Sequence, residues 1–138
     1  MLPLEEWRMG FDERFPIYRQ IVNELSRSLV RGKVAPGERI PSIRDMSLAL
    51  RVNTNTVQRA YQELERNSII FSQRGTGYFV MEDTHMIDRV KSGMVRDSVS
   101  RFLQEMTSLG FSRDEIVSAL EIQMKEGTDN VADDGARS

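Results

Sequence analysis

The chain has 138 residues, of which 39% are hydrophobic, and this length suits one small domain with an appendage. It contains no cysteine, which excludes disulfides, zinc–thiolate sites and thiol nucleophiles. No apolar run approaches the ~18–20 residues that span a bilayer, and the first residues lack the pattern of a signal peptide. The sequence therefore predicts a soluble, cytoplasmic protein with no membrane partner.

The net charge of −2 is unevenly distributed along the chain. Residues 16–80 contain ten Lys/Arg and five Asp/Glu, whereas residues 81–138 contain seven and twelve. The central part is thus able to meet phosphate groups while the acidic C-terminal part stays clear of them. Ordinary variation of surface charge is the alternative interpretation.

After an N-terminal extension of residues 1–15, Pro16 opens a helix that we expect over residues 16–31. Its apolar residues recur at helical spacing, and Gly32 is suited to end it. A second, short helix is predicted to begin after Ser42, which forms a capping-box pattern with Asp45, and to end near Leu50.

Asn53 is a good N-cap for a third helix, predicted to run to about Arg66. Two short helices joined by a three- to four-residue turn indicate a helix-turn-helix. Next, residues 69–71 and 78–80 are β-branched and aromatic, and they flank a glycine-containing tip, which predicts a β-hairpin. Residues 16–80 are therefore expected to form a winged helix-turn-helix.

From about Thr84 the pattern is helical again, and Gly110 separates two expected helices. Ser112 and Glu115 form a second capping box, and the last helix is expected to end near Gly127. Apolar residues spaced by four and three favour a seam between helices, so we predict a two-helix dimerisation tail over residues 84–126 that makes a homodimer. The residues assigned to dimerisation are Val95, Val99, Phe102, Met106, Leu109 and Leu120. Residues 127–138 are polar and acidic and are expected to be disordered. The predicted fold class is mainly α with a small β-hairpin.

The third helix presents amide, hydroxyl and guanidinium groups on the face opposite its apolar stripe. In a helix-turn-helix the second helix enters the major groove, where Asn and Gln bind adenine and Arg binds guanine. The candidate DNA-binding residues there are Asn53, Thr54, Asn55, Thr56, Gln58 and Arg59. A solvated polar helix face is the alternative.

Two further segments are candidates for contact with double-stranded DNA. Arg44 lies in the first turn of the second helix, where a cation opposes the helix dipole, so a contact with phosphate or a base would explain it. At the hairpin tip the glycines allow the backbone to approach phosphate closely, and arginine can enter the minor groove. These tip residues are Arg74, Gly75, Thr76 and Gly77. The alternative for Arg44 is a side chain that extends freely into solvent. The alternative for the hairpin tip is an ordinary glycine-rich turn.

Five segments in this order resemble the GntR family of bacterial transcription factors. They are residues 16–21, 36–44, 52–57, 60–65 and 74–80. The resemblance implies a transcriptional regulator whose DNA contacts fall on Arg44, Asn53, Thr54, Asn55, Gln58, Arg74 and Gly75. This sequence departs from many members of the family at two places. They have glycine where this chain has Arg51, and arginine where it has Thr54 or Asn55. Because only 58 residues follow Val80, the chain is similar to the YtrA-type subfamily with a short dimerisation tail, and we expect a repressor that binds an inverted repeat.

Other classes of function are less well supported. His85 is the only histidine, no nucleophile–base pair is evident, and the segment with Glu82 and Asp83 is expected to be a solvated linker rather than a metal site. We expect no catalysis, cofactor or metal.

An adaptor that uses the helical tail alone remains an alternative, which a gel-shift assay with genomic DNA fragments separates from a sequence-specific regulator. If a small-molecule effector exists, we expect it at the tail near Met86, Met94, Met106 and Met124, although core packing of these methionines is favoured.

Overall fold

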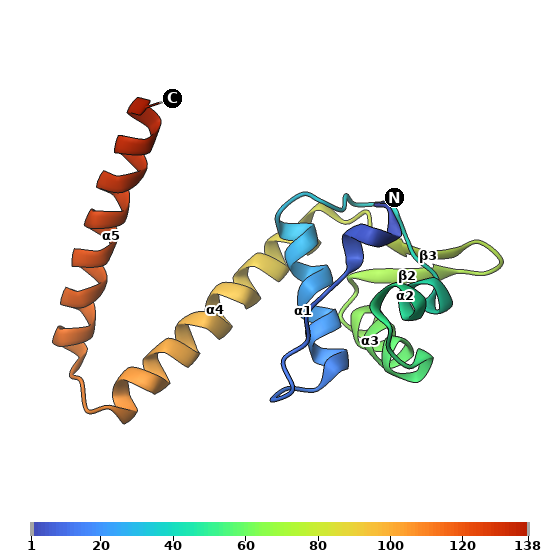
Figure 1. Ribbon diagram of the computed structural model, residues 1–138, viewed down its shortest axis with the longest axis horizontal. Coiled ribbons are helices and arrows are strands. Elements are labelled where there is room, and N and C mark those ends of the chain that lie inside the picture. Colours follow the sequence, from blue (N-terminus) through green and yellow to red (C-terminus); the bar gives the residue numbers. More distant parts are fainter. Residues whose placement is uncertain (1, 138) are drawn as a thin grey trace. The chain divides into compact units, whose positions relative to one another are not determined.

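The computed structural model describes residues 2–137 and the side chains of residues 2–128. The chain forms two compact units, Met1–Gly93 and Met94–Ser138. The elements in chain order are η1 (Leu4–Trp7), α1 (Ile17–Val30), β1 (Arg39–Ile40), α2 (Ile43–Leu50), α3 (Thr54–Arg66), β2 (Ile70–Gln73), β3 (Gly77–Val80), α4 (Thr84–Ser108) and α5 (Arg113–Arg137) (Figure 1). This mainly helical architecture with a small sheet confirms the predicted fold class.

Local signals in the sequence account for the ends of α2 and α3. The Ser42 hydroxyl accepts a hydrogen bond from the Asp45 backbone N–H, and the Asn53 side chain accepts one from the Asn55 N–H. Such caps satisfy backbone donors that have no partner within the helix. Helices α1, α2 and α3 surround a core whose largest fully buried side chains include Tyr61, Leu25, Leu29, Met46 and Leu64.

The sheet has three antiparallel strands in the order β1-β3-β2. In the hairpin, Ile70 pairs with Val80 and Gln73 with Gly77, which confirms the predicted wing. Strand β1 pairs Arg39 with Phe79 and was not predicted. Two residues are too few to show an alternating pattern in the sequence, and their pairing with β3 makes them a strand.

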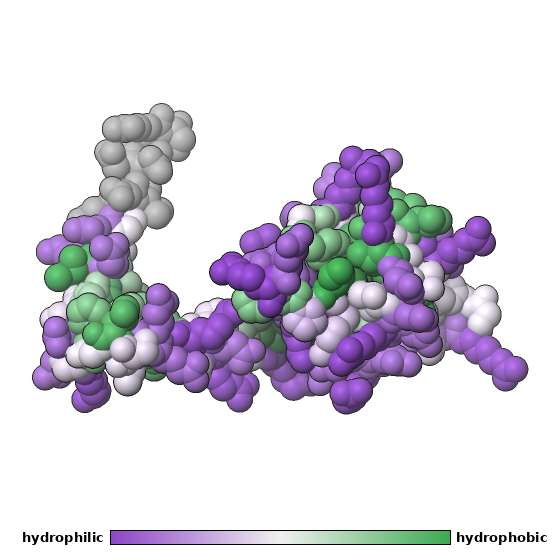
Figure 2. Space-filling view, turned by 60° about the horizontal axis from the view of Figure 1, so that its bottom comes forward, coloured by the Kyte–Doolittle hydropathy of each residue, from purple (hydrophilic) through white to green (hydrophobic). Residues whose placement is uncertain are grey.

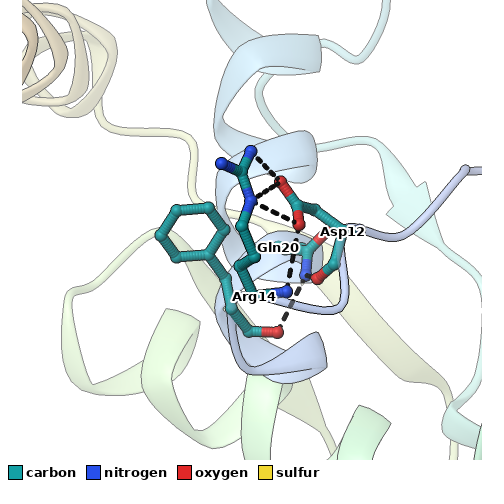
Figure 3. Close-up of polar contacts among 4 residues, drawn as sticks. Asp12, Arg14 and Gln20 are labelled. Atoms are coloured by element: carbon teal, nitrogen blue, oxygen red, sulfur yellow. Dashed lines mark hydrogen bonds and ion pairs between the residues drawn. The ribbon is translucent and has the colours of Figure 1, made fainter.

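The N-terminal extension packs onto the winged helix-turn-helix. Trp7 is only 4% exposed and belongs to the same hydrophobic core as α1 and α2. The Gln20 side chain accepts a hydrogen bond from the Asp12 backbone N–H and donates to the carbonyl oxygens of Asp12 and Phe15 (Figure 3). Residues 2–15 are thus a structural part of the first unit, which the hydrophobic patterns alone did not indicate.

Helix α4 begins at Thr84 as predicted, but its first residues belong to the winged helix-turn-helix unit. Met86 is fully buried in the core of that unit. Met86 therefore does not line an effector site in the tail. Its burial agrees with the favoured interpretation, in which these methionines pack in a core. Met124, by contrast, is 70% exposed.

The end of α4 and the start of α5 follow the sequence closely. Gly110 has a φ of +89°, a conformation that suits glycine after a helix. The Ser112 N–H donates to the Glu115 carboxylate and the Glu115 N–H donates to the Ser112 hydroxyl, which confirms the predicted capping box. Helix α5 continues through Gly127 to Arg137, beyond the predicted end, because a glycine in a helix costs only ~1 kcal/mol and no proline follows. The side chains of residues 129–138 lie outside the described part, and disorder of residues 127–138 stays a prediction.

Candidate DNA-binding surface

Helix α3 is the second helix of the helix-turn-helix, the position called the recognition helix in such folds, and it has one buried and one exposed face. Its buried residues are Val57, Ala60, Tyr61 and Leu64, and its exposed residues include Thr54, Asn55, Gln58, Arg59 and Gln62. The predicted exposed face is therefore present, with Thr56 half-buried beside it. Asn53 differs from the others because its side-chain oxygen accepts the Asn55 N–H at 2.8 Å and so caps the helix.

Tyr61 connects α3 to the neighbouring elements. Its hydroxyl donates a hydrogen bond of 2.7 Å to the carbonyl oxygen of Pro41, just before α2 begins. Its ring also meets the Tyr78 ring of β3 edge-on, with 5.0 Å between the centroids. Burial raises the pKa of Tyr61 far above its ordinary value, so the hydroxyl stays a donor. One side chain thus fixes α3 relative to both α2 and the wing.

The turn between α2 and α3 is held by two hydrogen bonds in opposite directions. The Ser47 hydroxyl donates to the Val52 carbonyl, and the Val52 N–H donates to the Ser47 carbonyl. Arg51 lies in this turn with a φ of 58°, in the left-handed region. This conformation costs an L-residue roughly 1–2 kcal/mol, which explains why glycine suits the position. Arg44, in the first turn of α2, is exposed as expected.

An open, polar groove of about 600 Å³ lies between α1 and α3. It is lined by Asn55, Gln58, Arg59 and three further α3 residues together with Tyr18 and Arg19 of α1. The guanidinium carbon of Arg59 lies 3.9 Å from the centre of the Tyr18 ring. Sequence analysis missed Tyr18 and Arg19, because helical periodicity identifies the faces of one helix but not which side chains meet across two helices.

The wing presents a tight turn and two arginines. Thr76 N–H donates to the Gln73 carbonyl, and Gly75 has a φ of +77° in the turn beside exposed Arg74. Gly77 has a φ of +126°, and a Cβ added there would lie only 3.2 Å from the guanidinium of Arg39. The Arg39 side chain therefore lies against β3 beside Gly77, close to the tip of the wing, a position that sequence analysis missed because it did not predict β1.

The segment around His85 is structured rather than a simple linker. The Asp83 carboxylate accepts the His85 backbone N–H at 2.9 Å and forms an ion pair with Arg89 at 3.2 Å. These interactions, the backbone hydrogen bond first, hold the pKa of Asp83 below its ordinary value. In the described part of the chain, no three His, Asp or Glu residues are arranged to bind a metal ion. None of the helices described there has both the length and the apolar character needed to cross a membrane.

The fold and this surface define a winged helix-turn-helix protein, and comparisons with known proteins agree. Residues 17–80 match the bacterial regulatory proteins of the gntR family. The HTH-type transcriptional regulator YhcF of Bacillus subtilis is 36% identical over 110 residues, which cover 80% of this chain and 91% of that protein. The HTH-type transcriptional repressor YtrA of Bacillus subtilis is 33% identical over 90 residues, covering 64% and 68%. A GntR family transcriptional regulator from Listeria monocytogenes has a similar structure, with a TM-score of 0.73, 35% identity and coverage of 80% and 97%.

The chain belongs to the GntR family of transcriptional regulators, in its YtrA-like subfamily. The expected family and subfamily are thereby confirmed. Members of this family are DNA-binding regulators and not enzymes, as the sequence analysis anticipated.

Proposed function

We propose that this regulator binds an inverted-repeat operator as a homodimer in the cytoplasm and represses transcription. The observation that carries the proposal is the apolar surface of the second unit. Val95 and Leu109 are 63% and 62% exposed, and Val99 and Leu120 are also exposed. Figure 2 shows hydrophobic surface on this unit, among hydrophilic side chains.

The second unit has little core of its own. Among the described side chains from residue 94 to residue 128, Ile116 is the one buried hydrophobic residue. Phe102 and Met106 are half-buried. Burying apolar surface is the main favourable term in association, so a second copy of the same unit is the partner that best covers this surface.

A two-fold protein suits an operator made of two half-sites, because each winged helix-turn-helix then meets an identical sequence. Repression is proposed on the likeness to YtrA, which is named as a repressor. In each half-site we propose that Asn55 and Gln58 read bases. Arg44 and Arg74 are proposed to hold phosphate or the minor groove, with Thr54, Thr56, Gly75, Thr76 and Gly77 beside them.

Sedimentation tests the dimer. Phe102→Asp places a charge on the apolar stripe of α4 and should give monomers that bind the operator more weakly. Gln104→Asp adds the same charge at an exposed polar position of α4 and should remain dimeric. A dimeric Phe102→Asp variant with unchanged affinity would place the interface elsewhere.

Selection from randomised DNA tests the division of roles at the operator. Gln58→Ala should change the preferred base at one position. Losing one base contact removes ~1–3 kcal/mol of the binding free energy that distinguishes the preferred base pair from the others. Arg74→Ala should leave the selected sequence intact, weaken binding to all sequences and lower the salt slope by about one. The reverse pattern would show that the wing reads the sequence and α3 only docks.

A further inference from the structure

We propose that Tyr18 of α1 is a positioning residue that orders Arg59 of the recognition helix to read a base pair. The inference rests on the proposed function and deepens it. It starts from the contact across the groove, where the Arg59 guanidinium carbon lies 3.9 Å from the centre of the Tyr18 ring. A cation at this distance over an aromatic face is held by the ring's quadrupole.

The two partners differ in burial, and this difference gives Tyr18 its role. Tyr18 is half-buried and packs against the hydrophobic core of the first unit, so its ring is a fixed platform. Arg59 is exposed on α3, and a free arginine loses much rotamer freedom when it binds. A platform that orders the guanidinium beforehand removes part of that cost from the binding step.

The surrounding charges leave the edge of Arg59 available. Glu63 forms an ion pair with Arg66 at 3.1 Å and a longer one with Arg19 at 3.9 Å. Arg59, in contrast, forms no ion pair or hydrogen bond with any described residue, and its guanidinium carbon lies over the Tyr18 ring. The Tyr18 ring lies on one side of the guanidinium and accepts no conventional hydrogen bond from it, so N–H groups of Arg59 remain free to donate.

The position of Arg59 on α3 favours a base contact. It lies one turn after Asn55 and next to Gln58, and all three line the same groove. A planar guanidinium edge matches the O6 and N7 acceptors of guanine with two parallel hydrogen bonds. We therefore assign Arg59 a guanine contact at the side of the recognition helix nearest α1.

A double-mutant cycle tests the assignment. The full chain first selects its preferred sequence from randomised duplex DNA, and affinities of the variants are then measured on that duplex. Tyr18→Phe keeps the ring and should bind within about 2-fold of the parent. Tyr18→Leu removes the ring and should bind about 2- to 5-fold more weakly, as expected for one exposed cation–π contact. Arg59→Ala should bind roughly 5- to 150-fold more weakly and lose the preference for one guanine.

The double variant separates positioning from direct contact. If Tyr18 acts through Arg59, Tyr18→Leu adds no further loss to Arg59→Ala. Additive losses, or a loss in Tyr18→Phe equal to that in Tyr18→Leu, would refute the proposal that Tyr18 acts through Arg59. A control, Arg27→Ala, removes the same charge from an exposed position of α1 outside the groove and should keep the selected sequence.

Two further readouts complete the test. The selected sequence shows whether Arg59 reads a base or binds phosphate. Affinity compared with thermal stability shows whether Tyr18 positions Arg59 or only stabilises the fold. If Arg59→Ala weakens all sequences alike and keeps the selected sequence, Arg59 is a phosphate contact and the base-reading role is wrong. If Tyr18→Leu lowers only the thermal midpoint and leaves affinity unchanged, Tyr18 is merely structural. Failure of the parent chain to select any sequence would instead refute the proposed function, so the two failures are distinguishable.

Discussion

Tyr61→Phe tests whether the hydrogen bond between α3 and the start of α2 stabilises the winged helix-turn-helix. The substitution keeps the ring, which is 1% exposed, and removes only the hydroxyl that donates to the buried Pro41 carbonyl at 2.7 Å. Leaving a buried acceptor without its donor costs about 1–3 kcal/mol. For a domain of this size, each kcal/mol lowers the thermal midpoint by about 4–8 °C.

The assay is thermal unfolding followed by circular dichroism, with Tyr78→Phe as the matched control. The Tyr78 hydroxyl makes no hydrogen bond to any described residue, so its removal should change the midpoint little. If both variants lower the thermal midpoint equally, the loss comes from removing any tyrosine hydroxyl. The argument that the hydrogen bond from Tyr61 to Pro41 stabilises the domain would then be refuted.

The same variant makes a prediction about pH. Burial raises the pKa of Tyr61 in the folded state above its ordinary value of 10.0. The stabilisation from its neutral hydroxyl is therefore constant below pH 10 and declines as the pH rises above 10, because the unfolded chain then ionises first. The stability difference between the parent and Tyr61→Phe should stay level from pH 6 to 9 and narrow above pH 10. A difference that widens there would contradict the burial argument.

Three further substitutions test features of single elements. Arg51→Gly should raise the free energy of unfolding by about 0.5–1 kcal/mol, because glycine adopts the left-handed turn without strain; chemical denaturation measures this, and a less stable variant would contradict it. Trp7→Ala should cost about 3–5 kcal/mol of stability if the N-terminal extension is part of the core, whereas an unchanged midpoint would show that it is dispensable. Hydrogen bonds to Ser112 hold the pKa of Glu115 below its ordinary value of 4.5, so the capping contribution is present above pH 4.5 and is lost as the pH falls below it. Helicity measured from pH 7 to 3 should therefore fall less in Glu115→Gln than in the parent, and equal acid transitions would argue against the cap.

The sequence determined the order and type of most elements. Asn53 and Ser42 are caps whose partners lie two or three residues away, so the starts of α2 and α3 follow from local chemistry. The same holds for Gly110 and for the capping box of α5. The exposed face of α3 was also predictable, because the apolar stripe of a helix defines its opposite side.

Only the tertiary structure decided which distant residues meet. Strand β1 exists because Arg39 and Ile40 pair with β3, and Trp7 is buried because α1 and α2 form a site for it. The contact between the Arg59 guanidinium and the Tyr18 ring likewise depends on how α1 and α3 pack. Periodicity and capping are properties of neighbours along the chain, whereas these contacts join segments whose relative placement is fixed by the packing of the whole core.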